Sequence, residues 1–505
     1  MRRGLDLWIA LGLLAVAWAI RLVLAARITF PPLDDPAFYV QTARNLAAGR
    51  GLVTDVLWSY QFSFPSVSHP SHEYWMPMAT LLMAPWIKAL GDTLFVAQLP
   101  GTLCAALLVP LTYALGRIVL PSDRRIAVGA VLLLMAGALP VYQAASTDSA
   151  APFALLGAGG LLVGGMAAER RSVGLSLLAG LLGGLAYLTR SDGMLIPALT
   201  GAFVVGSLGL TRRGLWMLVA LAAGCAVPMG AWWIRNGLTF GVMQPVSPMI
   251  AGALQNYEQM FNWNDPPTIR ALLARGAGFV AGLRAQALAH NFGVWALISF
   301  PFGTYGWLGL AEMARRPVMQ IGFAYGVLLA LVSAVVFSVP TLAGLFYHSA
   351  GATLPWLALG AAMGIARLAR RRRTAGFGLA AATAALIIVQ SAIAWPRAIE
   401  DSRRNSATFG EAARWLAAHA RADEPILATQ AHSLNLASGQ PAMTLPAGQA
   451  LDVVRDLARR YGARYVVVTE RVGRYPAEFD AHLGAGVELV HSGSDMLVYE
   501  LIAIP

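Results

Sequence analysis

The sequence predicts an α-helical polytopic membrane protein with a small α/β domain at its C-terminal end. Hydrophobic residues make up 57% of the 505 residues and charged residues only 12%. The mean hydropathy is +0.59, far above that of soluble proteins. The chain also contains many apolar runs, each about 20 residues long and able to cross a hydrocarbon layer of about 30 Å. Polarity becomes ordinary only after Arg397, so the composition excludes a soluble enzyme.

The apolar runs predict about eleven transmembrane helices. The first run, from Leu5 to Ala26, follows Arg2 and Arg3 and has no small-residue cleavage site before the next acids. We therefore expect an uncleaved helix that enters the membrane from the cytoplasm. The later runs lie at 93–116, 126–145, 150–168, 173–189, 194–210, 215–234, 289–311, 318–345, 350–366 and 375–395.

Arginine clusters set the predicted orientation. The net charge of +11 comes almost wholly from arginine, because Lys88 is the only lysine. The clusters fall at every second boundary between runs, so one orientation places all of them in the cytoplasm. This parity holds only if Met76–Gly91, which contains Pro77 and Pro85, is a juxtamembrane or partly inserted helix and not a span. The clusters are Arg117 with Arg124 and Arg125, Arg170 with Arg171, Arg212 with Arg213, Arg315 with Arg316, and Arg367 with Arg370–Arg373.

We expect a multi-pass protein of a bacterial inner membrane, with a cytoplasmic N-terminus and a periplasmic C-terminal domain. The sequence has no basic stripe with interleaved aromatic residues, which is the pattern that would indicate nucleic-acid binding. We expect the lipid bilayer to be the partner of the apolar runs. The same topology places one set of polar residues together at the external face: Asp34, Asp35, His69, His72, Glu73, Asp148, Arg190, Asp192, Arg235 and His348.

The acid pair Asp34 and Asp35 is the strongest candidate for chemistry. A charged side chain beside a membrane helix is costly unless it reaches water, a partner or a substrate. Asp35 also has a structural interpretation, because Asp35, Pro36 and a segment over Ala37–Ala48 closed by Gly49 form the pattern of a helix with Asp at its N-cap. Capping would lower the pKa of Asp35 and keep it ionised. A cap needs only one acid, however, and leaves Asp34 unexplained.

The segment from Asp34 to Gly51 resembles the first external loop of the GT-C membrane glycosyltransferases. The resemblance rests on the acid pair, Tyr39 and Ala43-Arg44-Asn45-Leu46-Ala47-Ala48-Gly49. In the aminoarabinose and mannosyl transferase version, Asp35 matches the catalytic acid and Pro36 stands where those enzymes often carry Glu. The arabinofuranosyltransferase version has the Asp-Asp pair itself. The resemblance thus implies that Asp35 is the catalytic base and that Asp34 is the alternative.

Shorter segments are also similar to this family. His72 and Glu73 lie in a segment that looks like the second juxtamembrane element, and Asp148 lies where many members have a second acid. Arg190 and Asp192 lie in Leu-Thr-Arg-Ser-Asp-Gly, which resembles a recurring Leu-Thr-Arg-Pro-Glu-Gly. Together with Tyr39, these residues are the candidate substrate-binding groups, and two more complete the set: Arg235 and His348.

The chemistry of sugar transfer explains why such residues would gather. The incoming hydroxyl needs a base, and the leaving phosphate needs cations or hydrogen-bond donors. Arg190 and Arg235 are suited to the phosphate, because guanidinium binds it in bidentate fashion and stays charged. Simpler roles stay open: Arg235 at a helix end reaching the interface, Arg190 paired with Asp192, and Asp148 as a helix cap.

Two further alternatives concern the histidines. His69, His72 and Glu73 could hold a divalent metal ion together with Asp34 or Asp35, although their spacing is no recognised metal motif. We therefore assign no metal-ligand residues, and a divalent metal ion remains an open cofactor. His348 lies among aromatic residues, where a structural role is the simpler interpretation.

The predicted organisation is a transmembrane GT-C-like catalytic domain over 1–397, with its first external loop at 28–92, followed by an extracytoplasmic α/β domain over 398–505. In the second domain we expect a helix over Gly410–Arg421, strands at Pro425–Thr429 and Arg464–Thr469, a helix over Leu451–Tyr461 and a final hairpin of 487–491 with 496–501. Alternating strands and helices favour a partly parallel sheet. The external loop 236–291, with Tyr257, is expected to form part of an acceptor cleft.

The resemblance implies an inverting membrane glycosyltransferase. It would move a sugar from a polyprenyl-phosphate donor to an acceptor hydroxyl on an unknown cell-envelope glycan, lipid or protein. A transporter or flippase of lipid-linked sugars is the main alternative, but it would place its polar site near mid-membrane. A catalytically silent envelope-assembly protein is the other alternative.

Overall fold

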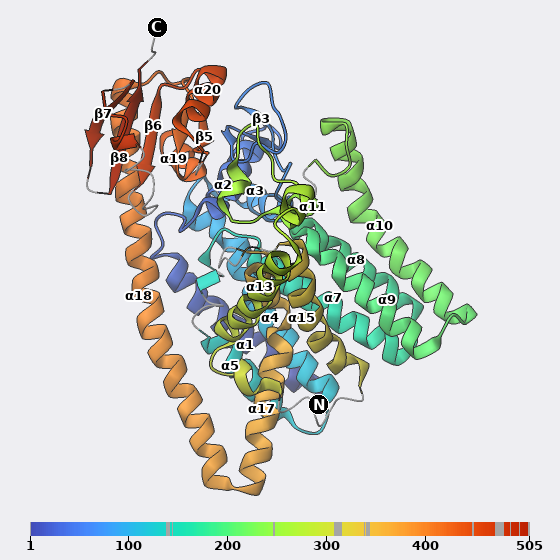
Figure 1. The fold of residues 1–505 in the computed structure, drawn as a ribbon. Coiled ribbons are helices and arrows are strands. Elements are labelled where there is room, and N and C mark those ends of the chain that lie inside the picture. The colour runs from blue at the N-terminus through green and yellow to red at the C-terminus, as the bar shows by residue number, and fades with distance from the viewer. Residues whose placement is uncertain are drawn as a thin grey trace.

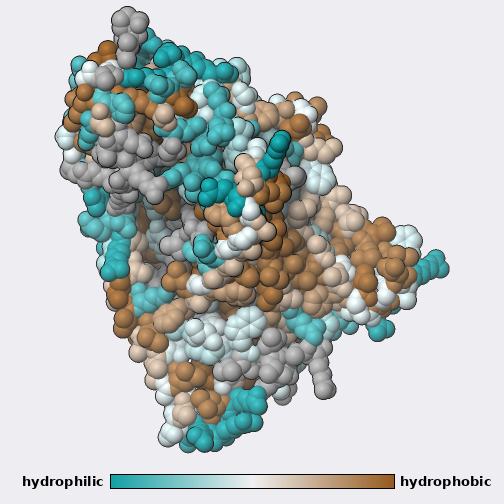
Figure 2. Space-filling view, in the orientation of Figure 1, coloured by the Kyte–Doolittle hydropathy of each residue, from teal (hydrophilic) through white to brown (hydrophobic). Residues whose placement is uncertain are grey.

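The computed structural model describes residues 2–137, 142–143, 145–245, 248–307, 316–337, 339, 344–446, 449–469, 479–484, 486–493 and 495–502. Helices form the body of the molecule, and a β-sheet lies at one end of it (Figure 1). Hydrophobic residues cover much of the middle of the face seen in Figure 2, and hydrophilic residues gather on the sheet and at the opposite end. This distribution fits a body surrounded by lipid.

Eight stretches of helix among the described residues are long and apolar enough to cross a membrane. They lie in α1 (Arg2–Ala25), α4 (Leu94–Val119), α7 (Ala150–Arg170), η1 (Ser191–Met194) with α9 (Leu195–Leu208), α10 (Arg212–Phe240), α15 (Pro317–Val336), α16 (Leu345–Ser349) with η3 (Ala350–Thr353) and α17 (Leu354–Arg371), and α18 (Arg373–His419).

The other three predicted runs also contain helices: α5 (Arg124–Ala136), α8 (Val173–Thr189) and α13 (Ala277–Ser299). Parts of the runs 126–145, 289–311 and 318–345, and Arg315 of one predicted cluster, lie outside the described residues. Each of the predicted apolar runs thus holds a helix, and the predicted fold class is confirmed.

Close backbone contact joins α8 to α10. A Cβ atom on Gly180 would lie 2.1 Å from the carbonyl oxygen of Leu221, and one on Gly224 would lie 2.2 Å from that of Leu177. Small residues at such crossings allow helices in a membrane to approach closely, where van der Waals packing replaces the hydrophobic effect. This contact fixes the ends of α8 and α10, which carry several residues of the candidate site.

Short elements fill the longer segments between the long helices. They are α2 (Asp34–Ala47), β1 (Val53–Thr54), β2 (Val56–Leu57), β3 (His69–Pro70), α3 (Met78–Leu90), α11 (Pro248–Ala253), η2 (Glu258–Phe261) and α12 (Ile269–Leu273). The stretch 76–91 was predicted to be a short helix that does not span, and α3 is a helix of 13 residues.

The start of α2 corrects the predicted cap. The helix begins at Asp34, its N-cap residue is Leu33, and no side chain makes a capping hydrogen bond there. Asp35 therefore lies inside the first turn and is not the N-cap. Pro36 is tolerated there because the first four N–H groups of a helix have no intrahelical partner. With its capping role removed, the Asp35 side chain is available for another function.

The C-terminal sheet has six strands in the order β2-β5-β4-β6-β8-β7. Its C-terminal strands are β4 (Ile426–Ala428), β5 (Ala442–Thr444), β6 (Tyr465–Thr469), β7 (Val487–Ser492) and β8 (Met496–Leu501), with helices α19 (Ala431–Ser438) and α20 (Leu451–Tyr461). Strands β2, β5, β4 and β6 pair in parallel, whereas β8 and β7 pair antiparallel. A partly parallel sheet was predicted, but α19, β5 and the participation of β2 were not.

Two features tie this sheet to the helical body. Strand β2 comes from the first external loop, so residues about 400 positions apart along the chain share one sheet, with Val56 opposite Ala442. Helix α18 runs without a break from Arg373 to His419, and Figure 1 shows it extending from the far end of the body up to the sheet. The first external loop and the C-terminal segment are thus held together.

Several arginines of the predicted clusters lie at helix ends and form ion pairs there. Arg124 lies 2.8 Å from Asp6 at the start of α1, and Arg316 lies 2.6 Å from Glu169 at the end of α7. The turn between α17 and α18, which holds Arg372, lies at the end of the molecule opposite the sheet (Figure 1).

Candidate active site

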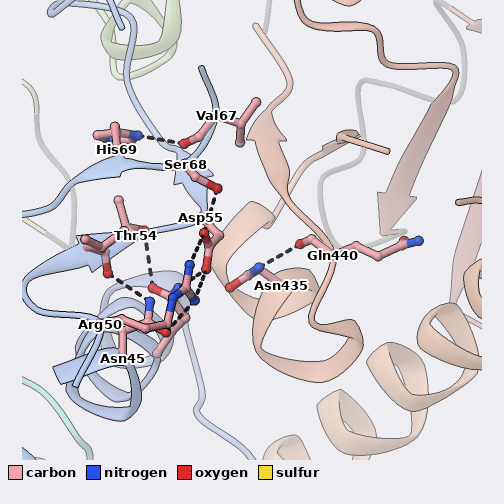
Figure 3. Close-up of polar contacts among 11 residues, drawn as sticks. Asn45, Arg50, Thr54, Asp55, Val67, Ser68, His69, Asn435 and Gln440 are labelled. Carbon is pink, nitrogen blue, oxygen red and sulfur yellow. Dashed lines mark hydrogen bonds and ion pairs between the residues drawn. The ribbon is translucent and has the colours of Figure 1, made fainter. Parts of the chain in front are cut away.

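A polar network fixes the end of α2 to the β1–β3 ribbon (Figure 3). Arg50 donates two hydrogen bonds, of 2.8 and 2.9 Å, to the carboxylate of Asp55. Asn45 donates to the carbonyl of Val53 at 2.9 Å, and Ser68 donates to Asp55 at 2.7 Å. Bidentate Arg–carboxylate pairs are geometrically specific, so this network holds the first external loop in one conformation.

Asp34 faces the C-terminal domain. Its Oδ1 accepts hydrogen bonds from the backbone N–H of Ser433 at 3.0 Å and from the Ser433 hydroxyl at 2.9 Å. Ser433 lies in the first turn of α19, whose free N–H groups favour a carboxylate. Burial raises the pKa of Asp34 to about 6, although the donors of Ser433 oppose this. Asp34 thus joins α2 to α19.

Asp35 lines a cavity whose space, together with the open solvent at its mouth, amounts to ≈ 1150 Å³. The cavity lies at the sheet end of the body, between α2, the first external loop, the loop after α10 and the adjoining ends of α8, α10, α15 and α16. Its lining includes six of the predicted site residues: Asp35, Tyr39, His72, Glu73, Arg190 and His348. It also includes Tyr257 and Met260 from the segment 236–291.

The electrostatic environment of Asp35 differs from the one expected for a cap. Burial raises the pKa of its carboxyl to about 7, and the negative charge of Asp148 adds to this effect. His348 and Arg190 act in the opposite direction. A carboxyl group with a pKa near neutrality exchanges protons readily at physiological pH, which suits a general acid or base.

Asp148 and His348 form a pair beside Asp35. Nδ1 of His348 lies 3.0 Å from Oδ2 of Asp148, and the hydroxyl of Ser149 donates to Oδ1 of Asp148 at 3.0 Å. Burial would raise the pKa of Asp148, but His348 and Arg190 together lower it to about 2. Asp148 is therefore ionised. It does not cap α7, whose N-cap residue is Ser149.

Arg190 is the cation of the cavity lining. Its Nε donates to the hydroxyl of Ser349 at 2.9 Å, and its Nη1 donates to that of Ser149 at 3.4 Å. Nε also lies 3.4 Å from Oδ1 of Asp192, so the ion pair considered from the sequence forms. Asp192 is buried and is not among the lining residues. Asp192 therefore contacts Arg190 from outside the cavity lining.

Arg235 is not among the cavity-lining residues. Its Nη2 donates to the carbonyl of Ser71 at 2.9 Å, and its Nη1 donates to Oδ1 of Asn236 at 3.0 Å. The guanidinium also lies 4.8 Å from the centre of the Trp232 ring. These contacts hold the loop that carries His72, which indicates a supporting role beside the cavity.

Sequence reasoning missed the aromatic part of the lining. Besides Tyr39 and Tyr257, six large rings line the cavity: Trp58, Tyr74, Trp75, Tyr187, Trp232 and Phe337. The density of aromatic residues in the first external loop was a usable signal, because exposed loops seldom carry so many. Among the residues that the structure describes, no group of three or more His, Cys, Asp or Glu side chains could hold a metal ion.

The comparisons with known proteins agree with this architecture. Residues 68–232 match a family model described as dolichyl-phosphate-mannose-protein mannosyltransferase. No curated protein matches the sequence. ArnT from Cupriavidus metallidurans, solved bound to undecaprenyl phosphate, is similar in structure with a TM-score of 0.62 at 15% identity, over 98% of each chain.

Two other solved structures share the fold. The apo oligosaccharyltransferase from Archaeoglobus fulgidus has a TM-score of 0.50 at 14% identity, over 93% of this chain and 71% of that one. The mycobacterial arabinofuranosyltransferase AftD has a TM-score of 0.51 at 15% identity, over 97% of this chain and 41% of that one. The chain thus has the fold of the GT-C membrane glycosyltransferases, and the predicted resemblance to them is confirmed.

Proposed function

We propose that this protein is an inverting membrane glycosyltransferase that uses a polyprenyl-phosphate sugar as donor. One observation carries the proposal: Asp35 and Arg190 line the same cavity at one end of the helical body. That arrangement supplies a base for an acceptor hydroxyl and a cation for a leaving phosphate. The similarity to ArnT bound to undecaprenyl phosphate supports the class of donor.

In the proposed reaction, Asp35 removes the proton of the acceptor hydroxyl as the hydroxyl oxygen attacks the anomeric carbon of the donor sugar. The new bond forms between that oxygen and the anomeric carbon. The bond from the anomeric carbon to the phosphate oxygen breaks, and the electron pair leaves with the polyprenyl phosphate. Attack from the face opposite the phosphate inverts the anomeric carbon, so one carboxylate is enough and no covalent sugar–enzyme intermediate forms.

Arg190 would bind the phosphate of the donor. Its guanidinium is oriented by Ser349 and Asp192, so little side-chain freedom is lost when the phosphate binds. The pair of Asp148 and His348 lies on the same side. His348 can donate to the phosphate while Asp148 holds its ring. Tyr39 and Glu73 also contribute polar groups to the lining.

The cavity would open at the external face of a bacterial inner membrane. Arg372, in the turn at the end of the molecule opposite the sheet, supports this orientation, because cytoplasmic loops are rich in arginine. The C-terminal domain would then be periplasmic and, held by Asp34 and β2, would cover the acceptor side of the cavity. The acceptor would be a hydroxyl group of a cell-envelope molecule.

A transporter is the other candidate class. Its coupling or substrate site would lie near mid-membrane, between broken helices of two repeated halves. The cavity described above instead draws on the sheet-side ends of α8, α10 and α15 together with external segments. This placement favours group transfer at one face over transport.

The test is turnover by the purified protein in lipid. The protein would be offered a panel of labelled polyprenyl-phosphate sugars with a lipid extract of cell envelopes as the source of acceptor. We expect label to move from at least one donor, and the Asp35→Asn variant to lose this transfer. Turnover unchanged in Asp35→Asn would refute the assignment of the base, and binding of every donor without transfer would favour a catalytically silent protein.

A further inference from the structure

The cavity contains a polar group that the proposed reaction does not use, the imidazole of His72. This residue is 2% exposed and lines the cavity in the loop between β3 and α3. Its φ of +69° lies in the left-handed region, which non-glycine residues seldom adopt. Such backbone conformations persist where the surrounding structure enforces them, and they are frequent at ligand-binding sites.

Hydrogen bonding fixes the tautomer of His72. Its Nδ1 lies 3.1 Å from the carbonyl oxygen of Trp75. Because a carbonyl only accepts hydrogen bonds, Nδ1 must carry the hydrogen, and the hydrogen-bond network assigns the lone pair to Nε2. Burial, aided by the charge of Arg235, lowers the pKa of His72 to about 3. The ring is therefore neutral, and Nε2 can only accept.

The acceptor atom lacks a protein partner. Nε2 of His72 is buried and has no hydrogen-bond partner in the described part of the chain. Leaving a buried acceptor without a partner costs free energy. A ligand that donates a hydrogen bond to this atom removes that cost. The rings of Phe38 and Trp232, at 5.0 and 6.1 Å from the imidazole, hold it in place by edge-to-face contacts.

The lining near His72 suits a sugar ring. Trp75, in the same loop as His72, and Trp232, on α10, also line the cavity. A sugar has apolar C–H faces that pack on aromatic rings and hydroxyl groups that donate hydrogen bonds at its edges. A phosphate is excluded from this position, because its oxygen atoms would meet the lone pair of Nε2. The anionic part of a ligand belongs at Arg190 instead.

We propose that Nε2 of His72 accepts a hydrogen bond from a hydroxyl group of the donor sugar, and that this contact orients the sugar with its phosphate toward Arg190. This inference rests on the proposed function. It divides the cavity into a phosphate end at Arg190 and a hydroxyl end at His72. A donor sugar with no hydroxyl at the matching position would bind poorly, so His72 is a specificity-determining residue.

The test uses His72→Asn. Asn is the non-glycine residue best suited to a positive φ, and its side-chain amide can still donate to the carbonyl of Trp75 while the Nε2 position is lost. The matched control is His432→Asn, which removes another buried imidazole, beside Phe38 and Trp75, that does not line the cavity. Binding would be measured in lipid nanodiscs with two probes: undecaprenyl phosphate, and the undecaprenyl-phosphate sugar found active in the donor panel.

We expect His72→Asn to weaken binding of the sugar-linked probe about five- to tenfold, the effect of one lost hydrogen bond, and to leave binding of undecaprenyl phosphate unchanged. His432→Asn should change neither. Equal weakening of both probes, or of neither, would overturn the proposal. If His72→Asn instead raised only the KM for the acceptor during turnover, the hydroxyl group would belong to the acceptor. That result would also overturn the proposal. Failure of the wild-type protein to bind any polyprenyl phosphate would instead refute the proposed function.

Discussion

Sugar transfer should accelerate about tenfold between pH 6 and pH 8 if Asp35 is the base, because the base must be deprotonated to act. Burial and the charge of Asp148 raise the pKa of Asp35 to about 7. With that value, about 9% of the carboxyl groups are ionised at pH 6 and about 91% at pH 8. The sign follows from the raised pKa: activity is lost as pH falls through 7.

The assay is kcat/KM for a labelled polyprenyl-phosphate sugar in proteoliposomes at half-unit steps from pH 5 to pH 9. This ratio reports the pKa of groups in the free enzyme. The residual rate of Asp35→Asn should lack the acid limb. A flat profile from pH 5 to pH 8, as expected if Asp35 titrated near pH 4 like an ordinary aspartate, would refute the environment that the structure assigns to Asp35.

Three further predictions concern the surroundings of this group. Arg190→Gln should raise KM for the donor about 10- to 100-fold. It also leaves buried Asp192 without its ion pair, so adding Asp192→Asn should restore the lost stability but not the donor affinity. An unchanged KM would contradict the phosphate role. Ser433→Ala removes a hydrogen bond to Asp34 and should lower the free energy of unfolding by about 1–2 kcal/mol, with activity per folded molecule retained; lost activity at full stability would contradict this. Gly224→Ala places a methyl group against the α8 backbone and should lower the thermal midpoint through overpacking of about 1–3 kcal/mol; an unchanged midpoint would contradict the close contact.

The helical body could be predicted from the sequence because its signals are local. Each apolar run has the length that a membrane requires, and arginine parity alone indicated that Met76–Gly91 does not span. Strands β4 and β6, helix α20 and the final hairpin were also predicted, since buried strands and amphipathic helices carry their own periodicity. The residues that form these elements are mostly close neighbours in the chain.

The long-range contacts could not be predicted in the same way. Strand β2 has only two residues, and its partner β5 lies about 400 positions away, so no local periodicity marks either strand. The same holds for the hydrogen bonds from Ser433 to Asp34. The predicted N-cap at Asp35 was wrong because the Asp-Pro pattern allows a helix to begin at either acid. The contact of Asp34 with α19 could not be predicted from local sequence patterns.

The candidate site was predicted in part. Six of the ten predicted residues line the cavity, while Asp34, Asp148, Asp192 and Arg235 contact neighbouring groups around it. Arginine parity placed these residues on one side of the predicted topology, but the different contacts of Asp34 and Asp35 needed the structure. The left-handed backbone and the free Nε2 of His72 also depend on three-dimensional packing, so no sequence pattern indicates them.

Comparing Asp35→Asn with Asp34→Asn tests the central claim most directly. Both variants would be purified in lipid and supplied with the same labelled polyprenyl-phosphate sugar and acceptor extract, with folding checked by thermal unfolding. We expect Asp35→Asn to lower kcat about 10²- to 10⁴-fold, the usual contribution of a general base, while Asp34→Asn retains most of the activity and loses stability. Full activity in Asp35→Asn, or loss of turnover only in a stably folded Asp34→Asn, would contradict the account.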